Sequence, residues 1–312
     1  MVSDFGESMT THEQTVSGER KDPRHDPATT TGTVLESVHP PAYGRGLLVS
    51  IFAAAIVFAL AIFASGGKDE FTGVPMTQTT GGLFWGLTVL AIILVAVGSQ
   101  YAEGVAIRVA ESLGQEPPRP AGLPAAWAVP AASVATALLL VATYHNRLML
   151  IAGPAIAFLG VAGGLFARDL LEDTMEGAER MAALIHTLVI HGVAFLGLSA
   201  VYMNKMTGWY GGPIVFVLTA VLMFEHLERA KLADGLRLLY SALAGGLITL
   251  ALLAISWWPT YGWTGGAALL LCFFVLAGLG SARGERQSLR DRDLIEYGVV
   301  FFGGLLILAI TL

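Results

Sequence analysis

The sequence predicts an all-α fold, a polytopic integral membrane helical bundle with about nine transmembrane helices behind a disordered N-terminal tail. Of its 312 residues, 54% are hydrophobic and only 13% are charged, and the mean hydropathy is +0.66. A soluble domain carries about 25% charged residues. Apolar runs of roughly 20 residues can cross a hydrocarbon core about 30 Å thick. No run alternates as a barrel strand does, so helices must satisfy the backbone inside lipid.

Two regions are expected, a disordered cytoplasmic tail at residues 1–44 and a transmembrane helical domain at residues 45–312. The tail is rich in Thr, Ser, Pro and mixed charge, with too little apolar surface to form a core. It lacks the pattern of a signal peptide, because the first apolar run begins only near Gly46.

Nine apolar runs are the expected spans, and the pattern places their ends only approximately. They are Gly46–Ser65, Gly82–Ser99, Ala125–Tyr144, Leu148–Ala167, Ala182–Met203, Tyr210–Glu225, Leu236–Trp258, Gly265–Ser281 and Leu294–Leu312.

Charged residues predict the orientation of these spans. Fifteen of the eighteen Lys and Arg residues lie in the tail and in alternate connections, and only Lys68, Arg147 and Lys205 lie on the other side. Cytoplasmic loops carry the excess of basic residues, so the N-terminus is expected inside and the C-terminus outside. Twenty-two of the twenty-four acidic residues fall on the same inner side, the exceptions being Asp69 and Glu70. Polar chemistry is therefore expected at the cytoplasmic ends of the helices.

Small residues at helical spacing predict where helices approach each other closely. Gly160 and Gly164 form one GxxxG pair, and Gly82 and Gly86 form another. Such pairs let helix backbones come together in lipid, where no hydrophobic effect drives association. We expect these contacts within the bundle rather than between two copies of the chain.

The connection between the fourth and fifth runs is the candidate metal site. Four carboxylates there, spaced i, i+3, i+4 and i+7, share one helical face. They belong to Asp169, Glu172, Asp173 and Glu176. Carboxylates of this kind hold Mg²⁺ and bridge it to a substrate phosphate. The alternative is a solvated charged face neutralised by Arg168 and Arg180, in which case no metal is bound and no cofactor is needed.

This acidic connection loosely resembles the motifs of intramembrane prenyltransferases, which also have nine helices with acidic cytoplasmic ends. The resemblance implies a Mg²⁺-dependent prenyl or lipid transferase. The sequence departs from that pattern at both expected places. After the second run, where those enzymes carry a dense aspartate motif, it reads Gln100-Tyr101-Ala102-Glu103; after the sixth it reads Glu225-His226-Leu227-Glu228-Arg229, with Glu228 and Arg229 of opposite sign. No catalytic residue is assigned.

The fifth run carries two intramembrane polar residues, His186 and His191. Five residues of helix turn their side chains about 140° apart, so the two cannot hold one metal or haem from the same helix. No histidine of another span is expected at their depth, and His226 is placed at the inner surface. The expected role is a neutral, hydrogen-bonded one inside the bundle, with proton transfer or transport as the alternative.

The C-terminal half carries a resemblance to a known family. Its residues are Ser256-Trp257-Trp258-Pro259, Gly265-Gly266, Phe273-Phe274, Gly278, Arg283, Leu289 and Glu296-Tyr297. Over roughly the sixth to ninth runs the chain resembles an uncharacterised family of multi-pass bacterial membrane proteins, a domain of unknown function. The resemblance implies the plasma (inner) membrane of a bacterium, and it brings no activity and no site residues.

These observations favour a non-enzymatic role as a membrane scaffold, assembly factor or partner-binding protein that acts through its cytoplasmic helix extensions. A small-molecule or lipid transporter is the first alternative, and the Mg²⁺-dependent transferase is the second. Membrane lipid and other membrane proteins are the expected partners. Nucleic acid is not expected, because the net charge of −6 mixes both signs along the chain.

Overall fold

The computed structural model describes residues 43–65, 81–112, 122–144, 146–170, 177–204, 210–230, 232–257, 262–286 and 290–310. They all belong to one compact unit, Pro41–Leu312. Within these ranges the regular secondary structure is entirely α-helical, which confirms the predicted fold class. The predicted tail lies outside the described residues except for Tyr43 and Gly44, which begin the first helix.

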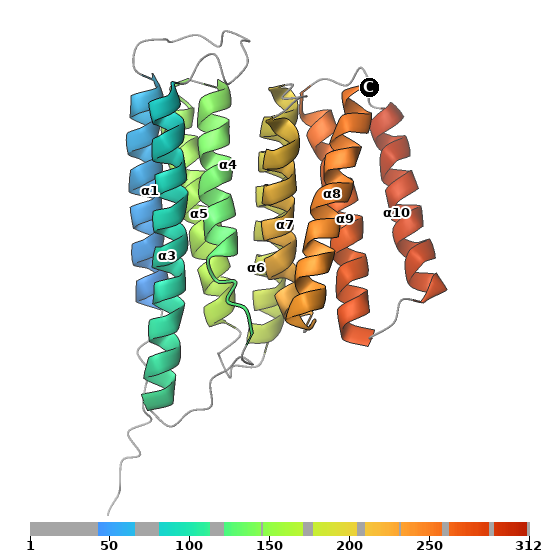
Figure 1. The fold of residues 1–312 in the computed structure, drawn as a ribbon, viewed down its shortest axis with the longest axis horizontal. Helices are drawn as coiled ribbons and strands as arrows, with labels where there is room; N and C mark the ends of the chain where they lie inside the picture. The colour runs from blue at the N-terminus through green and yellow to red at the C-terminus, as the bar shows by residue number, and fades with distance from the viewer. Residues whose placement is uncertain are drawn as a thin grey trace, which may run out of the picture. The chain divides into compact units, whose positions relative to one another are not determined.

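Nine helices lie in the described ranges, and each coincides with one predicted span. They are α1 (Tyr43–Ser65), α3 (Gly82–Ser112), α4 (Ala128–Tyr144), α5 (Met149–Asp169), α6 (Ala178–Met203), α7 (Gly211–Arg229), α8 (Asp234–Ser256), α9 (Trp263–Arg286) and α10 (Asp291–Ile310). Successive helices run antiparallel (Figure 1). In the part of the chain that the structure describes, eight helices are long and apolar enough to cross a membrane. The protein is therefore a multi-pass membrane protein.

The remaining helix, α4, has 17 residues, or about 25 Å of length at 1.5 Å per residue. It is the central helix of the bundle, because it packs against α1, α3, α5, α6 and α7. Val134 and Leu138 are fully buried, as are most of its other side chains. A helix enclosed by protein in this way has no need to match the thickness of the lipid.

The other helices surround α4 and its neighbour α6. On one side of this pair lie α1, α3 and α5, and on the other lie α7, α8 and α9 (Figure 1). The last helix, α10, packs mainly against α9. It leaves most of its apolar surface exposed, including Phe302 and Leu306, as expected for a helix at the lipid-facing edge of a bundle.

One of the two predicted glycine pairs lies at a helix contact. On α5, Gly160 faces Ser133 of α4, and a Cβ atom at Gly164 would lie 2.9 Å from Cγ1 of Val129. A larger residue at either place would push α4 away. The prediction for Gly82 and Gly86 is wrong, because a Cβ atom at either glycine has no neighbouring atom within 4 Å among the described residues.

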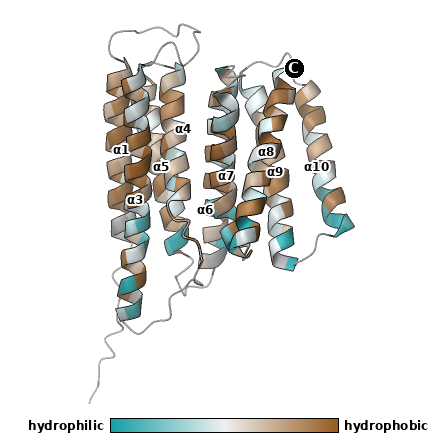
Figure 2. Cartoon of the chain, viewed as in Figure 1, coloured by the Kyte–Doolittle hydropathy of each residue, from teal (hydrophilic) through white to brown (hydrophobic). Residues whose placement is uncertain are grey.

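Hydrophilic residues gather toward one end of the helices, where α3, α5, α7 and α9 end and where α6 and α10 begin (Figure 2). This is the end that the charge distribution predicts to be cytoplasmic. The orientation in the membrane remains a prediction from sequence.

Candidate functional site

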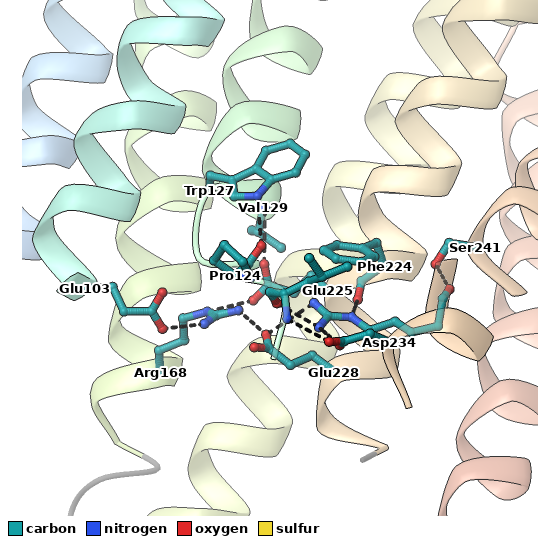
Figure 3. A network of polar contacts seen from close by, with 12 residues as sticks. Glu103, Pro124, Trp127, Val129, Arg168, Phe224, Glu225, Glu228, Asp234 and Ser241 are labelled. Atoms are coloured by element: carbon teal, nitrogen blue, oxygen red, sulfur yellow. Dashed lines mark hydrogen bonds and ion pairs between the residues drawn. The ribbon is translucent and has the colours of Figure 1, made fainter. Parts of the chain in front are cut away.

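At the hydrophilic end, three carboxylates converge on Arg168, which lies in the last turn of α5 and is 7% exposed. Its Nη1 lies 2.7 Å from Oε1 of Glu103 on α3, and its Nε lies 2.9 Å from Oε1 of Glu225 on α7. Its Nη2 pairs with Glu228, one turn further along α7. Figure 3 shows these side chains pointing toward one another from three helices. A planar guanidinium with five N–H donors can serve several carboxylates at once.

Glu225 has a second role at the start of the central helix. Its side chain is 1% exposed, and Oε2 accepts a hydrogen bond of 3.3 Å from the backbone N–H of Val129. The first N–H groups of a helix have no partner within the helix, and the positive end of the helix dipole favours a negative charge. Glu225 therefore neutralises Arg168 and caps α4 from another helix.

A second arginine, Arg237 in the first turn of α8, extends the network. Its Nε donates to the carbonyl oxygen of Phe224 at 2.7 Å, and its Nη1 donates to that of Leu123 at 3.0 Å. Asp234 accepts the backbone N–H of Leu123 at 3.1 Å. The backbone N–H and C=O groups of Leu123, which precedes α4, are thus both bound by side chains of α8. Arg237 also lies 3.8 Å from Glu228, which joins the two arginines into one network (Figure 3).

The network contains two guanidinium groups and four carboxylates, those of Glu103, Glu225, Glu228 and Asp234. Negative charge is therefore in excess. Backbone N–H groups and the positive ends of α4 and α8 offset part of this excess. Buried charges are tolerated when they are paired and hydrogen-bonded, and each charged group of this network has at least one partner of opposite charge. Nη2 of Arg237 is the exception at the level of single atoms, because it is buried and has no hydrogen-bond partner among the described residues.

The predicted acidic connection is described only at its first residue. Asp169 is half-buried at the end of α5, whereas Glu172, Asp173 and Glu176 lie outside the described residues. Among the residues that the structure describes, no group of three or more His, Cys, Asp or Glu is spaced to hold a metal ion. The Mg²⁺ site therefore stays a prediction.

Sequence reasoning considered Glu103, Glu225 and Glu228 only as two separate acidic places. The structure brings them together on Arg168, for which the sequence predicts a place on the acidic face of its own connection. One signal was present in the sequence, because Glu225 and Glu228 are three residues apart and share a face of a helix. Nothing in the sequence pattern identified Arg168 as their partner.

A second polar group lies between α6, α7 and α9, where three histidines meet. The ring centroid of His226 on α7 lies 6.2 Å from that of His186 and 6.4 Å from that of His191, both on α6. Nε2 of His226 is hydrogen-bonded to Oγ of Ser281 on α9 at 2.8 Å. The expectation that no histidine of another span lies at this depth is wrong. The C-terminal end of α7 packs inside the bundle, so His226 is enclosed. The rings of His186 and His191, on different sides of α6, both lie near it.

Few of the ring nitrogens in this histidine cluster have a protein partner. Nδ1 of His191 donates to the carbonyl oxygen of Thr187 at 2.8 Å, a bond within its own helix rather than between helices. His186 is 2% exposed. Neither of its nitrogens has a hydrogen-bond partner among the described residues, and the same holds for Nε2 of His191 and Nδ1 of His226.

Comparison with known proteins places this bundle in a family. The model of one protein family matches residues 68–311. No curated protein and no solved structure matches the chain. The resemblance expected from sequence covered roughly the sixth to ninth spans, whereas the match covers every described helix except α1. The chain belongs to the family described as "Protein of unknown function (DUF5656)".

Proposed function

We propose that the protein is a non-enzymatic scaffold in the plasma membrane of a bacterium, and that it binds another membrane protein through the cytoplasmic extension of α3. The observation that carries this proposal is the length of α3. It has 31 residues, or about 46 Å at 1.5 Å per residue, against a hydrocarbon core of about 30 Å. In Figure 1 its far end runs beyond the ends of the neighbouring helices.

The exposed face of this extension has the composition of a protein interface rather than of a lipid-facing surface. Tyr101 is 67% exposed and Val109 is 41% exposed, and the charged residues Arg108 and Glu111 are exposed beside them. Aromatic residues and arginine are enriched at interfaces. The base of the extension is fixed by Glu103 through its ion pair with Arg168, so the surface is presented in a defined position.

The ion-pair network supports a scaffold over an enzyme. A transferase would use the acidic ends of α3 and α7 to hold Mg²⁺, and here the guanidinium of Arg168 occupies the space between those carboxylates. The same network ties α3, α4, α5, α7 and α8 together at one end. A rigid element is suited to presenting a binding surface, because little entropy is lost when the partner docks.

Site-specific photo-crosslinking in native membranes tests the proposal. A crosslinking amino acid replaces Tyr101 on the extension, and in the matched control it replaces Leu90, an exposed apolar residue on the same helix. We expect a discrete protein adduct from position 101 and only lipid adducts from position 90. A folded protein that gives no protein adduct at 101, or the same adducts at both positions, would contradict the proposal.

The transferase alternative makes a separate prediction about Mg²⁺. A site at the acidic connection would stabilise the purified protein by RT ln(1 + [L]/Kd), about 2.7 kcal/mol at a hundredfold excess over Kd. We expect thermal unfolding to show no such shift. A Mg²⁺-dependent shift that disappears when Asp169 and Asp173 are both changed to Asn would place the transferase ahead of the scaffold.

Transport is the second candidate function, and the histidine cluster is the observation that favours it. Polar groups inside a membrane bundle are costly and commonly mark pathways for ions or solutes. His186, His191 and His226 lie between three helices, two of which, α6 and α7, also contact the central helix α4.

A further inference from the structure

The histidine cluster, formed by His186, His191, His226 and Ser281, contains more polar atoms than the surrounding protein satisfies. Four ring nitrogens are buried and have no hydrogen-bond partner in the described part of the chain. Two of them belong to His186, which is 2% exposed. Buried polar side chains almost always bond to protein or to ordered water. The cluster therefore offers several polar atoms to a hydrogen-bonding occupant.

The three rings lie close together without bonding to one another. His186 and His226 are nearly parallel, with 9° between their planes and 6.2 Å between their centroids, and no hydrogen bond joins the two rings. His191 approaches His226 edge-on at 6.4 Å. One oxygen atom that makes two hydrogen bonds of about 2.8 Å can link nitrogens ~5 Å apart. Internal waters typically make about three such bonds to buried polar groups.

The hydrogen-bonding roles of the rings define the chemistry of the occupant. Nδ1 of His191 must carry a proton, because its partner is the carbonyl oxygen of Thr187, and in the neutral ring Nε2 is then an acceptor. Neutral His186 offers one donor and one acceptor. The occupant must therefore donate to His191 and His186 and also accept from His186. A hydroxyl-bearing molecule does both, whereas an ammonium ion has no acceptor.

The surroundings also disfavour a cation. Arg229 lies one turn beyond His226 on α7, and its Nη1 donates to the carbonyl oxygen of Ala182, one turn before His186 on α6, at 3.4 Å. The carboxylate of Glu225, next to His226 in sequence, faces Arg168 and Val129 instead. A cation in the cluster would therefore lie near the guanidinium of Arg229 and away from the carboxylate of Glu225.

We propose that His186, His191, His226 and Ser281 form an intramembrane binding site for a small neutral hydroxyl-bearing molecule, either water or a small polyol. The site lies near the predicted cytoplasmic end of α6, α7 and α9. It is independent of the scaffold function, and it would also serve the transport alternative.

Nuclear magnetic resonance on the full-length protein in lipid bilayers, with ¹⁵N-labelled histidine, tests for the occupant directly. Single His→Gln variants at positions 186, 191 and 226 assign the ring signals. We expect magnetisation to pass from water protons to the ring nitrogens of all three residues. Addition of glycerol then separates the sources: saturable shifts at these rings identify a polyol site, and unchanged signals identify a water site. A lack of transfer from both water and glycerol overturns the proposal.

Thiol reactivity provides a second, independent measurement. In a Cys272→Ser background, His186→Cys is compared with Ile190→Cys, a matched control one turn along α6 that is 0% exposed. A thiol ionises and reacts only where water reaches it. We expect a small membrane-permeant thiol reagent to modify position 186 at least about tenfold faster than position 190. Equal rates in two folded variants would also overturn the proposal.

Discussion

At the scale of single residues, the most unusual feature is the enclosure of Arg168. Removing a buried charge from water is expensive, so an ion pair of this kind adds less to stability than its short distances suggest. The main effect of this ion-pair network is on the specificity of helix packing. The guanidinium can meet Glu103, Glu225 and Glu228 together only when α3, α5 and α7 hold one relative register.

Arg168→Met should therefore destabilise the protein strongly. It removes the cation and leaves Glu225, which is 1% exposed, as an unpaired buried charge, at a cost of about 3–5 kcal/mol. Chemical unfolding in detergent measures the loss. Adding Glu225→Gln should recover part of it, since no charge then remains at that position. The exposed Arg180 provides the control, because Arg180→Met should change stability by less than about 0.5 kcal/mol. Equal effects at the two arginines would refute the structural role of Arg168.

His191 separates the scaffold from the transporter at the same scale. His191→Gln keeps a polar side chain, and His191→Leu removes the bond to Thr187 at a cost of no more than about 1–2 kcal/mol. If the protein is a scaffold, both variants should fold and both should complement a deletion strain. Variants that fold normally but fail to complement, with a wild-type phenotype that depends on external pH, would favour transport.

The sequence could not predict either polar cluster, for a physical reason. Arg168 lies 65 residues from Glu103 and 57 from Glu225, and a periodic pattern reports only neighbours on one element. Within one helix, five residues separate the directions of His186 and His191 by about 140°. This angle could not reveal that His226 enters between them from another helix.

At the scale of helices, the contact between α6 and α9 depends on small residues. A Cβ atom at Gly266 of α9 would lie 2.7 Å from Cα of Ser199 on α6, and one at the neighbouring Gly265 would meet the ring of Tyr202. The Cα atom of Ser199 belongs to the backbone, so a change of side-chain rotamer cannot relieve this clash. The two helices must separate to accept even one methyl group.

Gly266→Ala should therefore destabilise the bundle by about 1–3 kcal/mol, the usual cost of overpacking. A matched control is Gly192→Ala on α6, where a Cβ atom has no neighbour within 4 Å. There, the higher helix propensity of alanine should leave stability unchanged or raise it by up to about 1 kcal/mol. Thermal unfolding of the two purified variants measures both changes in stability, the loss expected for Gly266→Ala and the unchanged or higher stability expected for Gly192→Ala. A neutral Gly266→Ala would show that α6 and α9 are not in close contact in the membrane.

Helix positions were predictable because hydropathy and length define a span, and each described helix coincides with one apolar run. The sequence predicted less well which neighbours surround each helix. Hydropathy alone does not separate α4, which is enclosed by five helices, from α10, which packs mainly against α9. Both lipid and protein accept apolar side chains. The glycines show the same limit, since the Gly160 pair packs against α4 while Gly82 and Gly86 have no close neighbour.

At the scale of the whole molecule, the nine helices of the described ranges run antiparallel, and their hydrophilic residues gather toward one end of the bundle (Figure 2). Arg168, Glu225 and the histidine cluster all lie toward that end. The connections that the charge distribution predicts to be extracytoplasmic hold only three basic residues in the sequence, Lys68, Arg147 and Lys205. If the basic end is cytoplasmic, the proposed partner surface on α3 and the ion-pair network both face the interior of the cell.

Cysteine labelling in intact cells tests this orientation. In a Cys272→Ser background the chain has no other cysteine, so one new cysteine at a time reports on its own side. A membrane-impermeant thiol reagent should modify cysteines placed at Thr207 and at the chain end, and it should leave one at Ser288 unmodified until the cells are opened. The reason is the free-energy cost of moving the arginines around position 288 across the bilayer, which holds that segment inside. Labelling at Ser288 without labelling at Thr207 would invert the topology and place the α3 extension outside the cell, where a cytoplasmic partner could not reach it.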